Sequence, residues 1–333
     1  MDELDHSIVV ELQKDGRRSE AQMARALQVS GTSVRRRIKR LVSDGVIRVA
    51  AMPNPPRVGY LTSAMICIQV APSELNNVAQ RLVEQPRVHT VILGYGQFDI
   101  YVRVTFRSQQ DLGDFIKTVL YAIPGVLRSE TLHILNEAKR SHAIIGRSEN
   151  RALASDIHFQ KREQGPAATD NAPVPLDDCD YDLIVDLQKD ARTSDAHLAR
   201  KLGVGSATVR RRIKRLVSQG IITIETVSNP AKVGYPMTVN IGMQVDLARL
   251  DDALASIKAM PRVQYIALVT GRFDLFLWAT FRSADALSDF LRHEMATVPG
   301  VLHTETLVNM EILKRDSAVL LPRAAPRVKS TIK

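Results

Sequence analysis

The chain contains the same long unit twice. The segment VRRRIKRLVS occupies residues 34–43 and recurs unchanged at 209–218, an offset of 175 residues (209 minus 34). The same offset aligns DHSIVVELQKD with DYDLIVDLQKD, NPPRVGY with NPAKVGY and GQFD with GRFD, so that residues 4–140 match 179–315 without a gap. Solenoid repeats have much shorter periods, and this one indicates a duplicated unit of more than one domain. Whatever fold the first copy adopts, the chain must build it a second time.

Two stretches fall outside the repeat. Residues 141–178 join the copies, and the part from 150 onward is rich in Pro, Ala, Gly and charged residues with few large apolar ones. This composition predicts a flexible linker. Residues 316–333 form a basic tail that we expect to be disordered.

Composition narrows the class of partner. The 333 residues carry a net charge of +9, which favours a polyanion, either nucleic acid or an anionic membrane surface. No run of 18 apolar residues predicts a membrane span, and the opening MDELDHSIVV is not typical of a signal peptide. Two distant cysteines, Cys67 and Cys179, indicate a reducing cytoplasm and exclude a disulfide framework or a cysteine zinc site.

The first part of each copy, residues 1–55 and 179–230, has the pattern of three short helices. Ser194 is a natural N-cap for the second of them in copy two, and Gly203 can close that helix with a positive φ. In copy one, Ser19 and the glutamine three residues later form a capping box. The glycine turn and β-rich segment that follow the third helix predict a small wing in each copy.

The repeated segment is the third helix. Val34, Ile38, Leu41 and Val42 give it one apolar stripe. The other faces carry five cations and no acidic residue: Arg35, Arg36, Arg37, Lys39 and Arg40. Two helices joined by a short turn, with this polarity on the second, are typical of a helix-turn-helix whose second helix enters the major groove. A basic helix can also be merely a solvated face. The duplication and the net charge favour DNA binding.

Position along the helix suggests what each side chain contacts. Residues near the helix start usually reach base edges, which here are Thr32, Ser33, Arg36, Thr208 and Arg211. The remaining cations are expected to contact phosphates: Arg35, Arg37, Lys39, Arg40, Arg210, Arg212, Lys214 and Arg215. Identical VRRRIKRL segments predict similar half-sites, but the preceding SGTS and GSAT differ, so the operator need not be a perfect palindrome.

The second part of each copy, residues 60–140 and 235–315, reads as strand, helix, strand, strand, helix, strand. This is the order of the ferredoxin-like fold, so the predicted class is α+β with two tandem copies of a winged helix-turn-helix and a βαββαβ domain. Both helices of such a domain lie on one face of its sheet, and the bare face needs a cover. A second sheet is the simplest cover, so we expect the sheets to dimerise, either between chains or between the two copies of one chain.

These residues resemble the Lrp/AsnC (leucine-responsive, or feast/famine) transcriptional regulators over nearly all of both copies. The resemblance rests on LARKLGVGSATVRRRIKRLVSQGII, NPAKVGY and TGRFDLF. It implies regulation of transcription, homo-oligomers assembled through the sheets, and an amino acid or similar small molecule as effector. It also places the effector at one turn of each copy, through Gly96, Asp99, Thr270, Gly271 and Asp274.

The chemistry of that turn suits a ligand, although another interpretation stays open. A glycine lets a ligand approach the backbone, and a carboxylate can pair with an ammonium group. Glycine and aspartate are also ordinary hairpin residues. The chain departs from the family in carrying two copies, like a covalently fused dimer, and in having Tyr95 where copy two has Thr270.

Other functions fit the sequence less well. No histidine faces another across the repeat, and HExxH, P-loop and GxSxG motifs are missing, so no catalytic residue, cofactor or metal is expected. Sirohaem decarboxylases resemble the same architecture, with histidines and aromatics around the second and third strands. Here His89 stands near that place and Gln264 replaces it in copy two. Such an enzyme has no use for two cationic helices.

Single-stranded nucleic acid is a third alternative. Proteins that bind RNA or single-stranded DNA rely on aromatic stacking, but aromatics make up 5% of this chain and none lies in the basic helices. The sequence therefore predicts a cytoplasmic regulator that binds double-stranded DNA.

Overall fold

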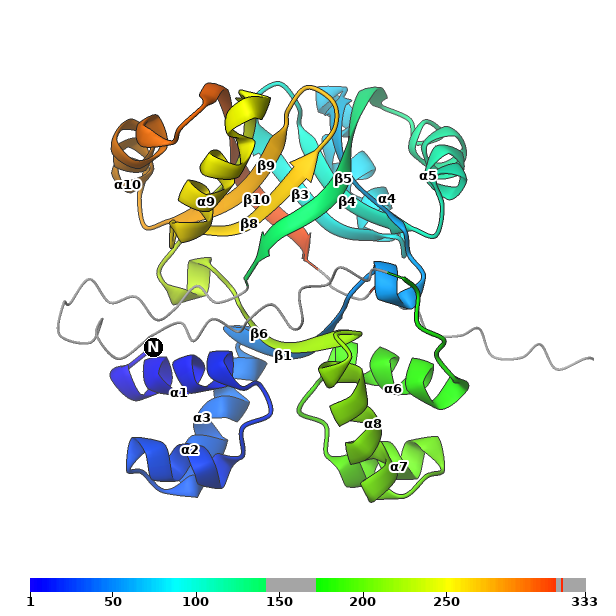
Figure 1. Ribbon diagram of the computed structural model, residues 1–333, viewed down its shortest axis with the longest axis vertical. Helices are drawn as coiled ribbons and strands as arrows, with labels where there is room; N and C mark the ends of the chain where they lie inside the picture. The colour runs from blue at the N-terminus through cyan, green and yellow to red at the C-terminus, as the bar shows by residue number, and fades with distance from the viewer. Residues whose placement is uncertain (142–171, 316–318, 320–333) are drawn as a thin grey trace, which may run out of the picture.

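The computed structural model describes residues 1–141, 172–315 and Val319 (Figure 1). Most of the predicted linker and nearly all of the predicted tail lie outside these residues. Two three-helix units stand at one end of the molecule, and a curved sheet with helices around it forms the other end, with a two-stranded ribbon between (Figure 1). Within the described part of the chain, no helix is both long and apolar enough to cross a membrane.

Each copy begins with the three predicted helices. They are α1 (Glu3–Lys14), α2 (Glu20–Leu27) and α3 (Gly31–Ser43) in copy one, and α6 (Asp178–Lys189), α7 (Asp195–Leu202) and α8 (Ser206–Ser218) in copy two. The predicted capping box is present, since the Ser19 and Gln22 side chains each accept from the other's backbone N–H. Gly203 ends α7 in the left-handed region at φ 67°, and Gln28 adopts φ 55° at the equivalent place in copy one.

The β-rich segment predicted after each third helix is a strand, and the two strands form one ribbon shared by the copies. Each copy supplies one strand, β1 (Ile47–Pro53) or β6 (Ile222–Ser228), and the two pair with each other antiparallel, with Ala50 opposite Glu225. A lone strand leaves its backbone groups unpaired, and the strand of the other copy satisfies them. The ribbon also joins the helical cores, because Val49 and Ala51 pack among the helices of copy two.

The second part of each copy forms the predicted ferredoxin-like domain. Copy one contains β2 (Thr62–Val70), α4 (Leu75–Val83), β3 (Val88–Tyr95), β4 (Ile100–Phe106), α5 (Gln109–Phe115) and β5 (Val126–Arg140). Copy two contains β7 (Met237–Val245), α9 (Leu250–Ala259), β8 (Val263–Val269), β9 (Leu275–Phe281), α10 (Ala284–Asp289) and β10 (Val301–Arg315). The strand orders are β3-β4-β2-β5 and β8-β9-β7-β10, so the α+β class is confirmed.

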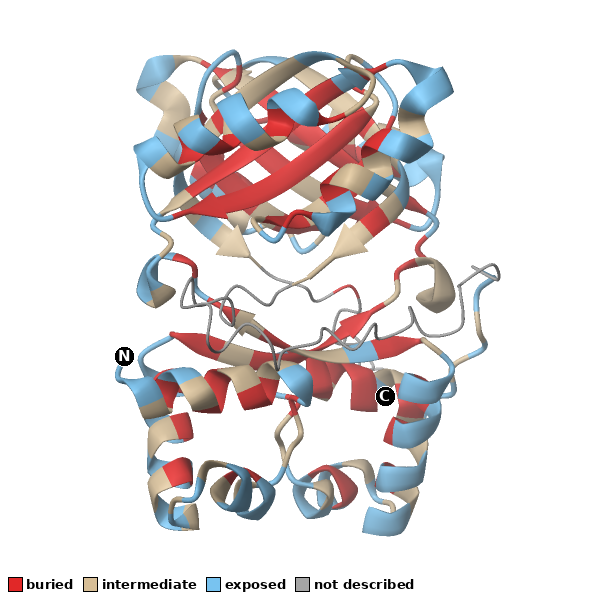
Figure 2. Ribbon diagram, turned by 60° about the vertical axis from the view of Figure 1, so that its left-hand side comes forward, coloured by how far each residue is buried: buried red, intermediate tan, exposed pale blue. Residues whose placement is uncertain are grey.

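The two sheets cover each other within one chain. β5 pairs with β8 and β10 pairs with β3, which closes the eight strands into a barrel. The helices lie outside this barrel, and six of its strands are largely buried, whereas β5 and β10 are mostly half-buried or exposed (Figure 2). The expected sheet pairing is therefore present, but between the two copies of the same chain.

One glycine allows the inner faces to pack closely. Gly242 of β7 lies under the Phe273 ring, and a Cβ at this position would come within 2.4 Å of ring carbons. Phe273 is 3% exposed and belongs to the apolar cluster inside the barrel, so its ring has little room to move.

Gly242→Ala is expected to lower the free energy of unfolding by about 2 kcal/mol, because overpacking a rigid interior forces side chains and strand apart. Guanidinium unfolding followed by Trp278 fluorescence measures it. The matched control is Gly113→Ala in α5, where an added Cβ meets no atom within 4 Å and alanine favours the helix. Equal stability of the two variants would contradict the close packing.

Candidate nucleic-acid interface

The apolar stripe of the third helix is narrower than predicted. Val34, Ile38 and Leu41 are buried in α3, but Val42 is 45% exposed and Val217, its equivalent in α8, is 42% exposed. The prediction was wrong for Val42 because a residue eight positions after Val34 lies about 80° further around the helix. A seventh-position residue such as Leu41 returns to the same face.

Four of the predicted DNA-binding arginines are held by carboxylates of another helix. Arg37 Nη1 lies 2.7 Å from Asp5 Oδ1 and 2.6 Å from Asp2 Oδ2, and Arg40 Nη2 lies 2.5 Å from Asp5 Oδ2. Asp5 is 1% exposed, so these arginines tie α3 to the start of α1.

Copy two repeats this arrangement. Arg212 Nη1 lies 2.7 Å from both Asp180 Oδ1 and Asp177 Oδ2, and Arg215 pairs with the other Asp180 oxygen. The basic helix itself contains no acidic residue. Its partners Asp180 and Asp177 come from α6 and from the residue before α6. We call the Asp5 and Asp180 clusters the helix clamps.

Two aspartates of the helix clamps, Asp2 and Asp177, have lowered pKa values. A backbone N–H of Asp180 and the guanidinium of Arg212 lower the pKa of Asp177 below its ordinary value. The carboxylates of Asp180 and Asp177 in turn raise the pKa of Arg212. In copy one the Asp5 backbone N–H, followed by Arg37, lowers the pKa of Asp2. Asp2 and Asp177 are therefore ionised at neutral pH and form salt bridges with Arg37 and Arg212.

Two further arginines form exposed pairs. Arg35 Nε lies 2.7 Å from Glu20 Oε2, and Arg210 Nε lies 3.1 Å from Asp195 Oδ2. The arginine side chains are 75% and 79% exposed. Pairs exposed to this degree contribute about 0–1 kcal/mol, so they open at little cost.

The remaining cations of the two helices point to solvent. Arg36, Lys39, Arg211 and Lys214 are exposed and make no ion pair with any residue that the structure describes. The predicted hydroxyls lie at the helix starts, where Thr32 is exposed while Ser33 and Thr208 are half-buried. Thr32 Oγ1 also lies 3.0 Å from Ser30 Oγ.

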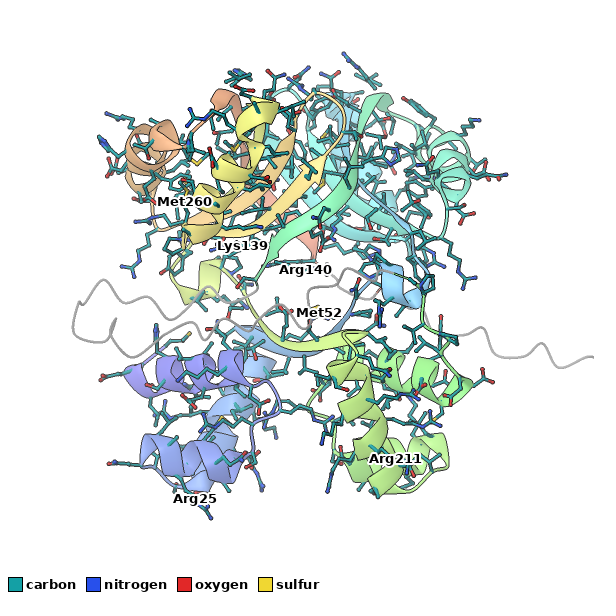
Figure 3. The ribbon with its side chains drawn as sticks, viewed as in Figure 1. Arg25, Met52, Lys139, Arg140, Arg211 and Met260 are labelled. Carbon is teal, nitrogen blue, oxygen red and sulfur yellow. The ribbon has the colours of Figure 1, made fainter. Side chains whose placement is uncertain are left out.

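Sequence reasoning missed two cations on the neighbouring helices. Arg25 of α2 and Arg200 of α7 are equivalent in the repeat, and both are exposed. Figure 3 shows Arg25 and Arg211 in the helical half of the molecule, away from the barrel. Their identity across the 175-residue offset (200 minus 25) was a signal that the sequence offered.

Direct contacts hold the two helical units at a fixed separation. Arg17 Nη2 of copy one lies 2.7 Å from Asp195 Oδ1 at the start of α7. Arg192 Nη1 of copy two donates to the carbonyls of Gly16 and Arg18 at 2.9 and 3.1 Å. Together with the ribbon, these bonds set the distance between α3 and α8.

The candidate effector residues lie at hairpin turns in the barrel. Gly96 and Gly271 have φ of 138° and 114°, which favour glycine. Asp99 Oδ2 accepts from the Val70 N–H at 2.8 Å, and Asp274 Oδ2 accepts from the Val245 N–H at 2.9 Å. Each carboxylate therefore ties its turn to the neighbouring strand, as the alternative structural interpretation requires. The other oxygen of each aspartate accepts no hydrogen bond from the part of the chain that the structure describes.

Both turns lie against the other copy. The Thr270 N–H donates to the His133 carbonyl at 2.9 Å. Arg272 Nη2 lies 2.6 Å from Glu305 Oε2, and its other nitrogen bonds Gln97 and lies 3.9 Å from Glu130 Oε2. The structure thus brings the candidate effector residues to the seam between the copies.

The helix clamps generate a stability prediction. Asp180→Asn is expected to reduce the free energy of unfolding by about 2 kcal/mol, because two arginines lose a buried carboxylate while staying partly hydrated. Urea unfolding followed by circular dichroism measures the change. Asp182→Asn, at an exposed position of the same helix, is the control. If both variants unfold alike, the clamp does not stabilise the unit.

Comparisons with known proteins agree with this architecture. The AsnC-type helix-turn-helix domain matches residues 1–42 and 176–217. The Lrp/AsnC ligand binding domain matches residues 63–144 and 238–319. Among the described residues, no group of three or more His, Cys, Asp or Glu side chains could hold a metal ion.

Individual relatives are similar to one copy or to the whole chain. An HTH-type transcriptional regulator of Pyrococcus furiosus is 38% identical over 141 residues, 42% of this chain and 95% of the relative. The HTH-type transcriptional regulator FL11 of Pyrococcus abyssi is 31% identical over 142 residues, 42% of this chain and 93% of its own. The crystal structure of the siroheme decarboxylase NirDL superposes with a TM-score of 0.62 over 94% of this chain and 93% of that one, at 14% identity, which shows a shared fold alone.

The two helical units correspond to the two helix-turn-helix matches, and the two halves of the barrel correspond to the two ligand-binding-domain matches. The chain belongs to the Lrp/AsnC family of transcriptional regulators, with both domains of the family present twice.

Proposed function

We propose that one chain binds double-stranded DNA sequence-specifically, with α3 and α8 in two major grooves. The observation that carries this proposal is the pair of unneutralised cationic faces, Arg36 with Lys39 and Arg211 with Lys214, on two helices held at a fixed separation. Helix-turn-helix dimers read two half-sites spaced by whole turns of the duplex. Here the covalent link replaces dimerisation.

The predicted contact residues divide by role. Thr32, Ser33, Arg36, Thr208 and Arg211 are proposed to reach base edges from the helix starts. Phosphate contacts are proposed for Arg35, Lys39, Arg210, Lys214, Arg25 and Arg200. We assign Arg37, Arg40, Arg212 and Arg215 to positioning, because the helix clamps already hold them.

The two half-sites are proposed to be similar but not identical. Thr32 offers a hydroxyl in copy one, where Ala207 stands in copy two. Ser30 caps α3, whereas the equivalent Gly205 offers no side chain to cap α8. These differences lie at the helix starts, where base edges are read, so they favour an asymmetric operator.

Association of several chains needs a surface other than the sheet faces that were first expected to pair. The inner sheet faces are occupied within the chain. Leu127 and Leu302, equivalent residues of β5 and β10, are 66% and 72% exposed. We propose that chains associate through such outer residues, since apolar side chains repeated at equivalent positions favour symmetric contacts.

We propose that an amino acid or similar effector binds at the hairpin turns, with Gly96, Asp99, Thr270, Gly271 and Asp274 around it. The match to a ligand-binding domain supports this proposal, and so does the position of the turns at the seam between copies. We further propose that the protein is not an enzyme, since its relatives are named transcriptional regulators.

Arg36→Ala and Arg211→Ala are expected to weaken operator binding about tenfold or more each and to relax base preference, because each removes a charged contact to a base edge. Operators are first selected from genomic fragments, and affinity is measured by fluorescence anisotropy at constant salt. Arg128→Ala, at an exposed position of β5, is the control. Unchanged affinity and preference would count against docking through these helices.

Asp274→Asn is expected to blunt the response of operator binding to a panel of amino acids while leaving effector-free affinity within about twofold, because the amide still accepts the strand hydrogen bond but cannot pair with an ammonium group. The anisotropy assay measures both. Asp99→Asn, the same change in copy one, reports which turn responds. A full response in both variants would leave these aspartates as turn residues only.

A further inference from the structure

A cavity of about 110 Å³ lies between the barrel and the ribbon. Its walls come from strands of both sheets, and Arg48 of β1 and Val227 of β6 line the side facing the helical units. Figure 3 shows Arg140, at the end of β5, above Met52 of the ribbon. The cavity is thus at the junction of the two halves of the molecule, apart from the hairpin turns.

The cavity is lined by cations. Arg48, Arg103, Arg140 and Arg315 contribute to its wall, and no carboxylate is among the described lining residues. Glu137 lies nearby, but it already pairs with Arg103, lies 3.5 Å from Arg140 and accepts from the Tyr265 hydroxyl at 3.2 Å. Glu137 is therefore shared by Arg103 and Arg140, while Arg315 pairs with no carboxylate among the described residues.

Buried polar atoms at the cavity lack partners. His89 is 6% exposed and Gln264 is 3% exposed, and neither His89 Nε2 nor Gln264 Oε1 has a hydrogen-bond partner among the described residues. The same holds for Arg103 Nε and Arg315 Nη1. Such atoms are rare in folded proteins unless something else satisfies them.

At neutral pH Arg315 is charged and His89 is neutral. Burial, followed by the charge of Arg48, lowers the pKa of Arg315 to about 10, which still leaves it protonated at neutral pH. Burial, followed by Arg103, lowers the pKa of His89 to about 3, so the imidazole is neutral. The charge in the wall therefore belongs to the arginines.

Aromatic rings form another side of the cavity. The Arg315 guanidinium carbon lies 4.4 Å from the centre of the Trp278 ring, and that of Arg103 lies 5.2 Å from the Tyr265 ring. Phe276 completes the aromatic wall. The repeat aligns Trp278 with Arg103, so the two copies have diverged to place a flat ring on one side and a cation on the other.

We propose that this cavity binds one small aromatic carboxylate, with its carboxylate on Arg140 and Arg315 and its ring against Trp278 and Phe276. Guanidinium groups bind carboxylates in a planar, bidentate manner, and aromatic rings stack at low entropic cost. The volume is somewhat below the about 150 Å³ of an apolar cavity that holds benzene, so the ligand proposed here has no more than one ring.

Benzoate and its neutral analogue benzamide test the proposal on the intact protein. Isothermal titration calorimetry is expected to give saturable benzoate binding about tenfold tighter than benzamide binding, because a charged acceptor strengthens each hydrogen bond. Benzoate is also expected to change the fluorescence of Trp278, the single tryptophan of the chain. Absence of saturable binding, or equal binding of the two compounds, would overturn the proposal.

Variants locate the site. Arg315→Gln is expected to weaken benzoate binding about tenfold, while Arg128→Gln, at an exposed position, leaves it unchanged. If Arg315→Gln fails to fold, as judged by circular dichroism, Arg140→Gln takes its place as the variant of the proposed carboxylate contact. Wild-type affinity in a folded variant of either kind would refute this site. None of these measurements involves DNA, so their outcome is independent of the proposed regulatory function.

Discussion

The pairing of β1 with β6 is the interaction on which the rest of the structure depends. Each strand is a single extended segment without a partner in its own copy, and the backbone groups of the other strand satisfy its own. Val49 and Ala51 then complete the core of the opposite helical unit. The same two-fold relation brings β5 onto β8 and β10 onto β3, so the ribbon and the barrel impose one geometry on both ends of the molecule.

Sequence pattern predicted the elements that depend on neighbours in the chain. The duplication, the order of strands and helices, and the Ser19 capping box were all visible, because spacing and propensity act over a few residues. The pairing of the two wing strands was not predicted, because the sequence of a strand does not specify a partner that lies over 170 residues away (222 minus 47). The burial predicted for Val42 was wrong for a simpler reason. Residues eight positions apart on a helix do not lie on the same face, because 3.6 residues per turn does not divide eight evenly.

The sequence predicted how many cations the basic helices carry, but not which of them are exposed and which form ion pairs. Arg36 and Arg37 are adjacent and chemically identical, yet one points to solvent and the other pairs with Asp2 and Asp5. Only the packing of α1 against α3 distinguishes them. The cavity is a similar case. The exchange of Arg103 for Trp278 can be read from the repeat, but only closure of the two sheets into a barrel brings both side chains to the wall of one cavity.

The Arg272 guanidinium at the seam between the hairpin turns affects which halves of the chain can pair. Arg272 serves Glu305 and approaches Glu130, and the equivalent of Arg272 in copy one is Gln97, which carries no charge. If the first halves of two different chains paired with each other, two Glu130 side chains would meet two Gln97 side chains with no cation between them. Like charges left uncompensated at such a contact raise its free energy. Pairing of two first halves is therefore disfavoured, and pairing of a first half with a second half is favoured.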